Sequence, residues 1–272
     1  MGGLAHILDY QFMRNAFLAM LLLAPLLGML GTQVVSARMA FFADALGHSA
    51  FAGIAIGVLL GISDPLLAMI GFGLVFAFGI VVGRERGGAS ADTTIGVFSS
   101  FAMALGILLL SVGGGFAKYS AFLVGDVLAI GPADLLRLAA VLALFLAYWA
   151  LAYNRLLLSG IQPQVAQSRG VRVLLHEILF NVMVAVVVMV SIRWVGLLVI
   201  NAMLVVPAAA ARRLSGSVRA YQALSVGISL VSGLAGLVVS YLADVPAGAA
   251  FVVVAAAAYL VSVVVSRVRG KA

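Results

Sequence analysis

Two ionisable residues stand four positions apart inside an apolar stretch, AFFADALGHSA at residues 40–50. Residues four apart lie one above the other on the same face of a helix, so Asp44 and His48 are expected to be neighbours. Counted from Arg38 at about 1.5 Å per residue, His48 lies about 15 Å deep, near the middle of a hydrocarbon core about 30 Å thick. An ionisable side chain at that depth is costly and is usually paired or functional.

A carboxylate and an imidazole suit zinc, manganese or ferrous iron, and the chain has no cysteine for a thiolate-preferring metal. Two ligands do not fill a coordination shell, so another helix, a second subunit or water must supply the rest. Two hypotheses stay open at this point. Either a metal ion passes Asp44 and His48, or the two side chains bond to each other and only help the helices to pack.

Other polar residues are weaker candidates for metal contact. Asp126 and Asp244 are expected near the outer ends of helices, where a capping role is favoured over metal binding. Asn201 lies inside an apolar run and is expected to bond across helices. His176 and Glu177 begin an apolar run at the inner interface and are expected to stay hydrated.

The sequence contains no recognisable catalytic set. No G-x-x-x-x-G-K-S/T motif occurs, so the chain cannot itself hold nucleotide phosphates in a P-loop. The histidine at mid-membrane depth has no serine partner arranged as a triad. We therefore expect that the chain is not an enzyme and that any ATPase is a separate chain.

The composition predicts a membrane protein. Of 272 residues, 65% are hydrophobic and 9% are charged, whereas a soluble domain carries about 25% charged residues. A helix that crosses the hydrocarbon core needs about 20 apolar residues. We expect an all-α polytopic membrane protein with eight or nine transmembrane helices in a single domain over 1–272. The predicted spans are 14–36, 40–60, 65–83, 93–111, 133–153, 173–191, 195–211, 219–241 and 247–266.

The basic residues predict the orientation, because cytoplasmic joints carry an excess of Lys and Arg. One set of joints holds Arg14, Lys118, Arg137 and Arg193, and the opposite set holds Arg38, Arg84, Arg86, Arg155, Arg169, Arg172, Arg212, Arg213, Arg219, Arg267, Arg269 and Lys271. The richer set predicts a cytoplasmic C-terminus in the cytoplasmic membrane of a prokaryote. The N-terminus lacks a basic region followed by a cleavage site, so no removable signal peptide is expected. The side on which it lies depends on whether the first helix crosses the membrane.

Two connections are longer than a hairpin. Residues 112–132 are Gly-rich and apolar, and are expected to form a partial or re-entrant segment on the outer side. Residues 154–172 are the substantial cytoplasmic loop. Its middle, from Gln162 to Arg169, is expected to form a short helix ended by Gly170, with a plain surface linker as the alternative.

The segment around the Asp–His pair resembles the signature R-x-x-x-x-G-D-A-x-S-H-A of metal-uptake ABC permeases, which import zinc, manganese or iron. It reads RMAFFADALGHSA at 38–50, with Ala43 in place of the usual Gly and Gly47 in place of Ser or Ala, so neither change removes a ligand. Further matches follow in order, and together they extend over about 14–266: DTTIGVFSS at 92–100, GDVLA at 125–129, VGLLVINAMLVVPAAAAR at 195–212 and DVPAG at 244–248.

The resemblance implies a helical bundle like that of the vitamin B12-type (type II) importers, with fewer helices. It implies a permease subunit without a permanent cofactor that imports a divalent metal ion by ATP-driven alternating access, zinc being favoured and manganese or iron left open. The implied partners are a second copy of the permease, two copies of an ATPase, an extracytoplasmic metal-binding protein and membrane lipid, with no nucleic acid. The metal would pass Asp44 and His48.

The same resemblance implies a helix that contacts the ATPase. Its residues are Gln162, Pro163, Gln164, Val165, Ala166, Gln167, Ser168, Arg169 and Gly170. Gln162 stands where the family usually has an acidic residue.

Two other functions remain open. A type II permease for an organic chelate, such as cobalamin or a siderophore, would need a wide cavity and would leave the Asp–His pair for packing. A proton-coupled secondary carrier would need no ATPase and typically shows internal repeats, of which this sequence has none strong enough to argue from.

Overall fold

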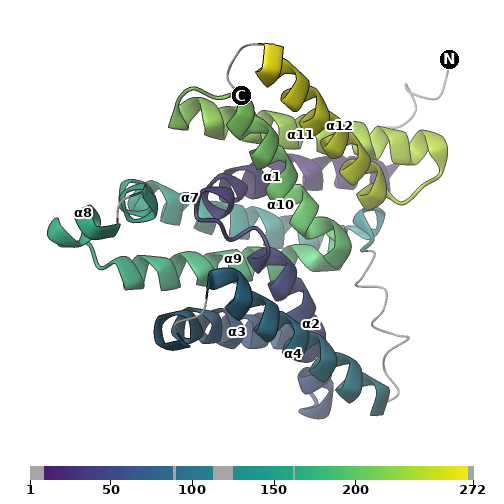
Figure 1. Ribbon diagram of the computed structural model, residues 1–272. Helices are drawn as coiled ribbons and strands as arrows, with labels where there is room; N and C mark the ends of the chain where they lie inside the picture. Colours follow the sequence, from purple (N-terminus) through teal and green to yellow (C-terminus); the bar gives the residue numbers. More distant parts are fainter. Residues whose placement is uncertain (1–8, 88–89, 113–124, 162, 269–272) are drawn as a thin grey trace. The chain divides into compact units, whose positions relative to one another are not determined.

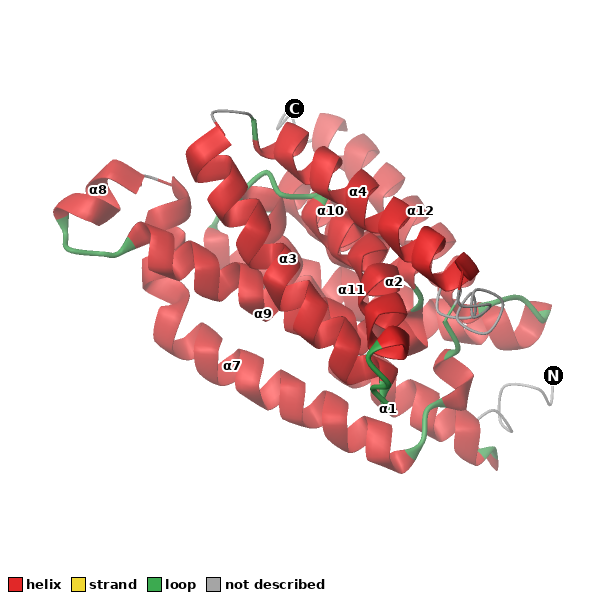
Figure 2. Ribbon diagram, turned by 90° about the horizontal axis from the view of Figure 1, so that it is seen from below, coloured by secondary structure: helices red, strands yellow, loops and turns green. Residues whose placement is uncertain are grey.

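The computed structural model describes residues 9–87, 90–112, 125–161 and 163–268, and every regular element in them is helical (Figures 1 and 2). Nine helices in these ranges are long: α1 (Gln11–Ser36), α2 (Phe42–Leu59), α3 (Pro65–Gly87), α4 (Ala91–Val112), α7 (Pro132–Ile161), α9 (Val173–Val195), α10 (Leu197–Leu214), α11 (Val218–Ala243) and α12 (Ala247–Val268). The predicted spans coincide with them one to one. In the described part, eight of them are long and apolar enough to cross a membrane. The expected polytopic all-α fold is confirmed.

The structure describes the connection at 154–172 except for Gln162, and the connection at 112–132 only in part. The connection predicted to be cytoplasmic begins later than expected, because α7 continues to Ile161 and residues 154–161 are helical. It then holds the short helix α8 (Pro163–Ser168). Of the connection at 112–132, residues 113–124 lie outside the described part of the chain, and with them the predicted re-entrant segment. The part that follows contains only the 3-10 turn η2 (Val127–Ala129).

The chain divides into two compact units, each assembled from separated stretches of sequence. Unit 1 combines Met1–Val35, Val124–Ala143 and Arg193–Ala272, and unit 2 combines Ser36–Leu123 and Leu144–Ile192. The single domain expected over 1–272 stays a prediction.

In unit 2, helix α2 lies beside both α3 and α4, and glycine makes the close approach possible (Figure 1). A Cβ atom on Gly53 would lie 3.0 Å from Cα of Met69 on α3. A Cβ atom on Gly106 of α4 would lie 2.7 Å from the backbone N of Ala52. Lipid supplies no hydrophobic driving force between helices, so this close backbone contact is what holds the three together.

In unit 1, α10, α11 and α12 lie side by side, and α1 crosses them through glycine and hydroxyl contacts. A Cβ atom on Gly31 would overlap the backbone oxygen of Leu204 on α10. The Ser225 hydroxyl on α11 donates a hydrogen bond of 2.7 Å to the carbonyl of Gly28. Interhelical hydrogen bonds of this kind fix the rotation of one helix against another within the membrane.

Replacing Gly31 with alanine is expected to destabilise the protein by about 1–3 kcal/mol, because the added methyl group forces α1 and α10 apart. The matched control is Gly227→Ala on α11, where a Cβ atom meets nothing within 4 Å. The control should be neutral or stabilising by up to about 1 kcal/mol, since alanine favours a helix over glycine. Thermal unfolding of the detergent-purified protein measures both. Equal stability of the two variants would contradict the described crossing.

Candidate metal-transit site

Asp44 and His48 lie on one face of α2, as their spacing predicts. Oδ2 of Asp44 and Nε2 of His48 are 3.3 Å apart, and the two side chains are 40% and 25% exposed. From Phe42 to Gly57, every residue of α2 is buried except Asp44, His48 and Ile56. Asp44 and His48 therefore form a short open stripe near the start of a helix that is otherwise enclosed, about one turn before Phe51 and Ala52, where α4 packs.

The separation of the two ligand atoms suits a shared ion. At metal–ligand distances of about 2.1 Å, two ligand atoms on a tetrahedral zinc lie about 3.4 Å apart. The other imidazole nitrogen, Nδ1 of His48, is buried and has no hydrogen-bond partner among the described residues. The ring is thus directed at Asp44 through Nε2, while no described neighbour binds Nδ1.

The pair is an incomplete coordination shell. The described residues contain no group of three or more His, Asp or Glu side chains placed to hold a metal ion. A zinc or manganese ion needs at least four ligands. Asp44 and His48 would supply two of them, and water or a second molecule would have to supply the others.

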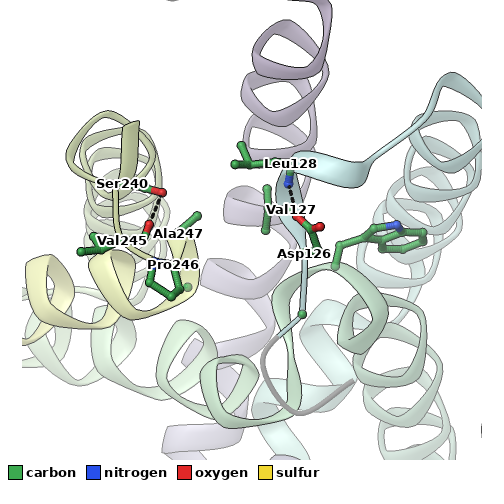
Figure 3. A pocket seen from close by; sticks show the side chains of 10 residues that line it. Asp126, Val127, Leu128, Ser240, Val245, Pro246 and Ala247 are labelled. Carbon is green, nitrogen blue, oxygen red and sulfur yellow. Dashed lines mark hydrogen bonds between the residues drawn. The ribbon is translucent and has the colours of Figure 1, made fainter. Parts of the chain in front are cut away.

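Asp126 serves as a cap in the structure, which is the role that the sequence favours. Its Oδ1 accepts hydrogen bonds from the backbone N–H groups of Leu128 and Ala129, at 3.1 and 3.2 Å. In unit 1 it lines a cavity of about 100 Å³ together with Val245 and Pro246, and Figure 3 shows these residues around it. On the wall formed by the other segment, the Ser240 hydroxyl donates to the carbonyl of Val245 at 2.6 Å. Each bond fixes its own loop, and the two loops line the cavity together.

The two remaining weak candidates also belong to unit 1. Asp244 ends α11 in the left-handed conformation, with φ of 53°, and is exposed. Asn201 lies in the second turn of α10, and its Oδ1 is buried without a hydrogen-bond partner in the described chain. Among the predicted metal-path residues, the pair on α2 is the one that the structure brings within ligand distance.

The predicted coupling helix is present as α8. Its end is a Schellman motif: the N–H of Val171 donates to the carbonyl of Ala166 at 3.0 Å, and the N–H of Gly170 donates to Gln167 at 2.9 Å. Gly170 has φ of 76°, as the motif requires. Gln162 lies outside the described residues. Ala166 is fully buried, whereas Gln164, Gln167, Ser168, Arg169 and Gly170 are exposed. The helix thus presents a fixed polar surface to solvent.

The expectation of hydrated side chains at the start of α9 is wrong. Glu177 Oε1 lies 2.6 Å from Nη1 of Arg84 at the end of α3, and His176 is only 9% exposed. Sequence reasoning missed this ion pair, because the partner is distant along the chain and sequence alone does not say which joints meet.

Asn181 is a second residue that the sequence reasoning missed. It lies within α9, is 1% exposed, and neither amide atom has a hydrogen-bond partner among the described residues. A polar side chain in the apolar run 178–190 is the signal that could have identified it.

Known proteins resemble this chain over nearly its whole length. The ABC 3 transport family matches residues 9–266. The manganese import system permease protein ScaB of Streptococcus gordonii is 30% identical over 93% of this chain and 91% of its own length. The high-affinity zinc uptake system membrane protein ZnuB of Haemophilus influenzae is 28% identical over 93% of this chain and 97% of its own length.

The fold is similar to that of PsaBC from Streptococcus pneumoniae, solved in complex with Fab. The TM-score is 0.84 at 28% identity, over 95% of this chain and 93% of that one. The family resemblance and the fold class predicted from the sequence are both confirmed. With 258 of its residues matched, from 9 to 266, the chain belongs to the ABC 3 transport family.

Proposed function

We propose that this chain is the permease subunit of an ABC importer for a divalent transition metal ion, and that the ion passes Asp44 and His48. The observation that carries the proposal is the open stripe of α2, where a carboxylate and an imidazole lie 3.3 Å apart on a helix whose other faces are enclosed. The names of relatives support the substrate class, because one relative imports manganese and another takes up zinc. Both ligand types suit either metal, so the pair does not choose between them.

A second copy of the permease completes the shell. Soluble and membrane homodimers pair through a two-fold axis, which brings the same surface of both copies together. Two open stripes facing each other supply two carboxylates and two imidazoles, enough for a tetrahedral ion. The ion is cargo and moves by ligand exchange, so the permease performs no bond chemistry and is not an enzyme.

ATP hydrolysis takes place on a separate ATPase that binds α8. The chain has no P-loop, and α8 offers an exposed polar surface on a rigid, capped turn. A path of packed helices within unit 2 links α8 to the metal pair. It runs through α9 and α3, which meet at Glu177 and Arg84 and again where Met189 contacts Gly73, and from α3 it reaches α2 at Gly53.

The protein lies in the cytoplasmic membrane with α8 and the C-terminus inside, and a metal-binding protein delivers the ion from the other side. Packing within unit 1 supports the predicted alternation of the helix ends between the two sides of the membrane. In unit 1, the loops at Asp126 and Val245 meet at one end, and the ends of α1 and α10 meet at the other through Val35 and Arg212. The distribution of basic residues predicts the same arrangement: the first two loops share the outer side, and the ends of α1 and α10 share the cytoplasmic side. Membership of an ABC family leaves a proton-coupled carrier without support.

Replacing Asp44 with alanine, or His48 with alanine, is expected to reduce metal uptake about a hundredfold or more, because even second-shell partners of a metal cost 10–100-fold when removed. Uptake of radioactive zinc and manganese into cells measures the loss. The matched control is Ser49→Ala, on the same helix but buried, where the hydroxyl only bonds the carbonyl of Leu46. The control should transport normally.

Assembly with the ATPase is measured on the same variants by co-purification. Normal uptake by both variants, with the complex intact, would contradict the transit site. Growth of a deletion strain in chelated medium, rescued by zinc alone or manganese alone, identifies the cargo.

Replacing Gln167 on α8 with tryptophan is expected to uncouple ATP hydrolysis from transport, with uptake reduced about tenfold or more, since a contact worth 1.4 kcal/mol or more is lost at the interface. The control is Arg219→Trp, at an exposed position on α11 outside α8. Hydrolysis and uptake are measured together in proteoliposomes. Unchanged coupling in the Gln167 variant would place the ATPase contact on another surface.

A further inference from the structure

A basic hollow of about 330 Å³ lies at one end of unit 1, lined by Val35, Ala209, Arg212, Arg213 and Tyr259. It is formed by three helices, with Val35 on α1, the two arginines on α10 and Tyr259 on α12. The residues named for the proposed metal path and the ATPase contact belong to unit 2, and none of them lines this hollow.

The arginines are held in place but keep most of their donors free. Arg213 Nη2 donates to the hydroxyl of Tyr259 at 3.2 Å, and its guanidinium carbon lies 5.4 Å from the centre of the tyrosine ring. Arg212 Nη1 donates a long hydrogen bond of 3.4 Å to the carbonyl of Val35. Each guanidinium has about five N–H donors. The structure therefore orients two cations at one opening without satisfying them.

The floor of the hollow is rigid. Ala208 and Ala211 lie close to Ala209 on α10. They are fully buried and pack with Tyr221 of α11. The Tyr221 hydroxyl donates to the carbonyl of Thr32 on α1 at 3.3 Å. Because α1, α10 and α11 are locked together here, the hollow is a fixed feature of the unit.

No acidic side chain in the described part of unit 1 is placed to neutralise these arginines. Its acidic residues are Asp9, Asp126, Asp134 and Asp244. They lie before α1, at η2, in the first turn of α7 and at the end of α11, so in the described chain they belong to the opposite ends of these helices. Helix α10 has 18 residues, which separates its two ends by about 27 Å. Among the described residues, neither arginine forms an ion pair with an acid.

The wall beside the hollow is apolar and open to lipid. Val252, Val253 and Ala256 precede Tyr259 on α12, on the side of the hydrocarbon core in the predicted orientation; Val252 is half-buried, Ala256 is exposed and Val253 is 69% exposed. A tyrosine with an apolar body and a polar tip is typical of the boundary between hydrocarbon and headgroups. A ligand in the hollow would have its charged part at the arginines and apolar chain along α12.

We propose that the basic hollow binds the phosphate group of an anionic phospholipid. The two guanidinium groups bind the phosphodiester oxygens, with Arg213 oriented by Tyr259, and the acyl chains lie along the exposed face of α12. Basic pockets between transmembrane helices on the cytoplasmic side bind anionic headgroups in this way, and arginine binds phosphate with parallel hydrogen bonds.

The test measures lipid binding to the detergent-purified transporter by native mass spectrometry, with added phosphatidylglycerol or phosphatidylcholine as the probe. Wild-type protein should bind phosphatidylglycerol in preference. Arg213→Gln should weaken that binding about fivefold, and the double variant R212Q/R213Q about thirtyfold, since a basic residue near an anionic surface contributes about 1 kcal/mol. The matched control is Arg219→Gln, an exposed arginine of α11 outside the hollow. It should keep wild-type binding.

Two further measurements separate the alternatives. Tyr259→Phe keeps the ring and removes only the hydroxyl, so it should fold normally and show a smaller loss than R213Q. Inorganic phosphate at millimolar concentration should not displace the lipid, because it lacks the acyl chains. The proposal is overturned if wild-type protein binds both lipids equally or if free phosphate competes fully. It is also overturned if the double variant keeps its lipid but loses the ATPase, since the arginines would then contact protein.

Discussion

The close approach of α2 to its neighbours is the constraint on which the candidate site depends. Gly53 meets the backbone of α3, and Gly106 of α4 meets the backbone of α2 at Ala52. With backbones in contact on both sides, α2 cannot rotate without a clash, because packed helices in a membrane leave no room for an added methyl group. The direction in which Asp44 and His48 point is therefore set by glycine packing, at Gly53 on the opposite face and at Gly106 about one turn further along the same face. No bound ion is needed to hold them there.

Charge is segregated in this molecule because lipid does not tolerate it elsewhere. Arg84 and Glu177 satisfy each other at a helix end, where partial exposure keeps the cost of two charges small. The Asp–His pair differs, since it lies in the first two turns of α2 and leaves Nδ1 of the imidazole without a hydrogen-bond partner among the described residues. A structural pair would be expected to satisfy both nitrogens through neighbouring groups. The partly exposed carboxylate and imidazole, and not the buried Nδ1, are the groups that an ion from outside the chain can reach.

The sequence predicted the helices well because the apolar runs are long and their joints carry charge or proline. Asp44 and His48 were found for the same reason, since four-residue spacing on a helix is local information. The Glu177–Arg84 ion pair and the basic hollow were not predictable, because each joins residues from different helices. For Asp126, the sequence predicted part of the local structure and missed the rest. Its position near a helix end predicts a cap. Only the packing of the distant loop at Val245 shows that this cap lines a cavity.

An importer must release its cargo. On the proposed function, the two ligands that one chain supplies explain how the ion is released. Two ligands from one chain hold a divalent ion weakly, since the remaining positions are filled by exchangeable water. Four ligands from two facing stripes hold it strongly. A movement of α8 that reaches α2 through α9 and α3 needs only to separate the two stripes for the ion to lose half of its protein ligands. Affinity then falls through the loss of ligands alone. A complete shell within one chain would bind the ion in every state and would lack this means of release.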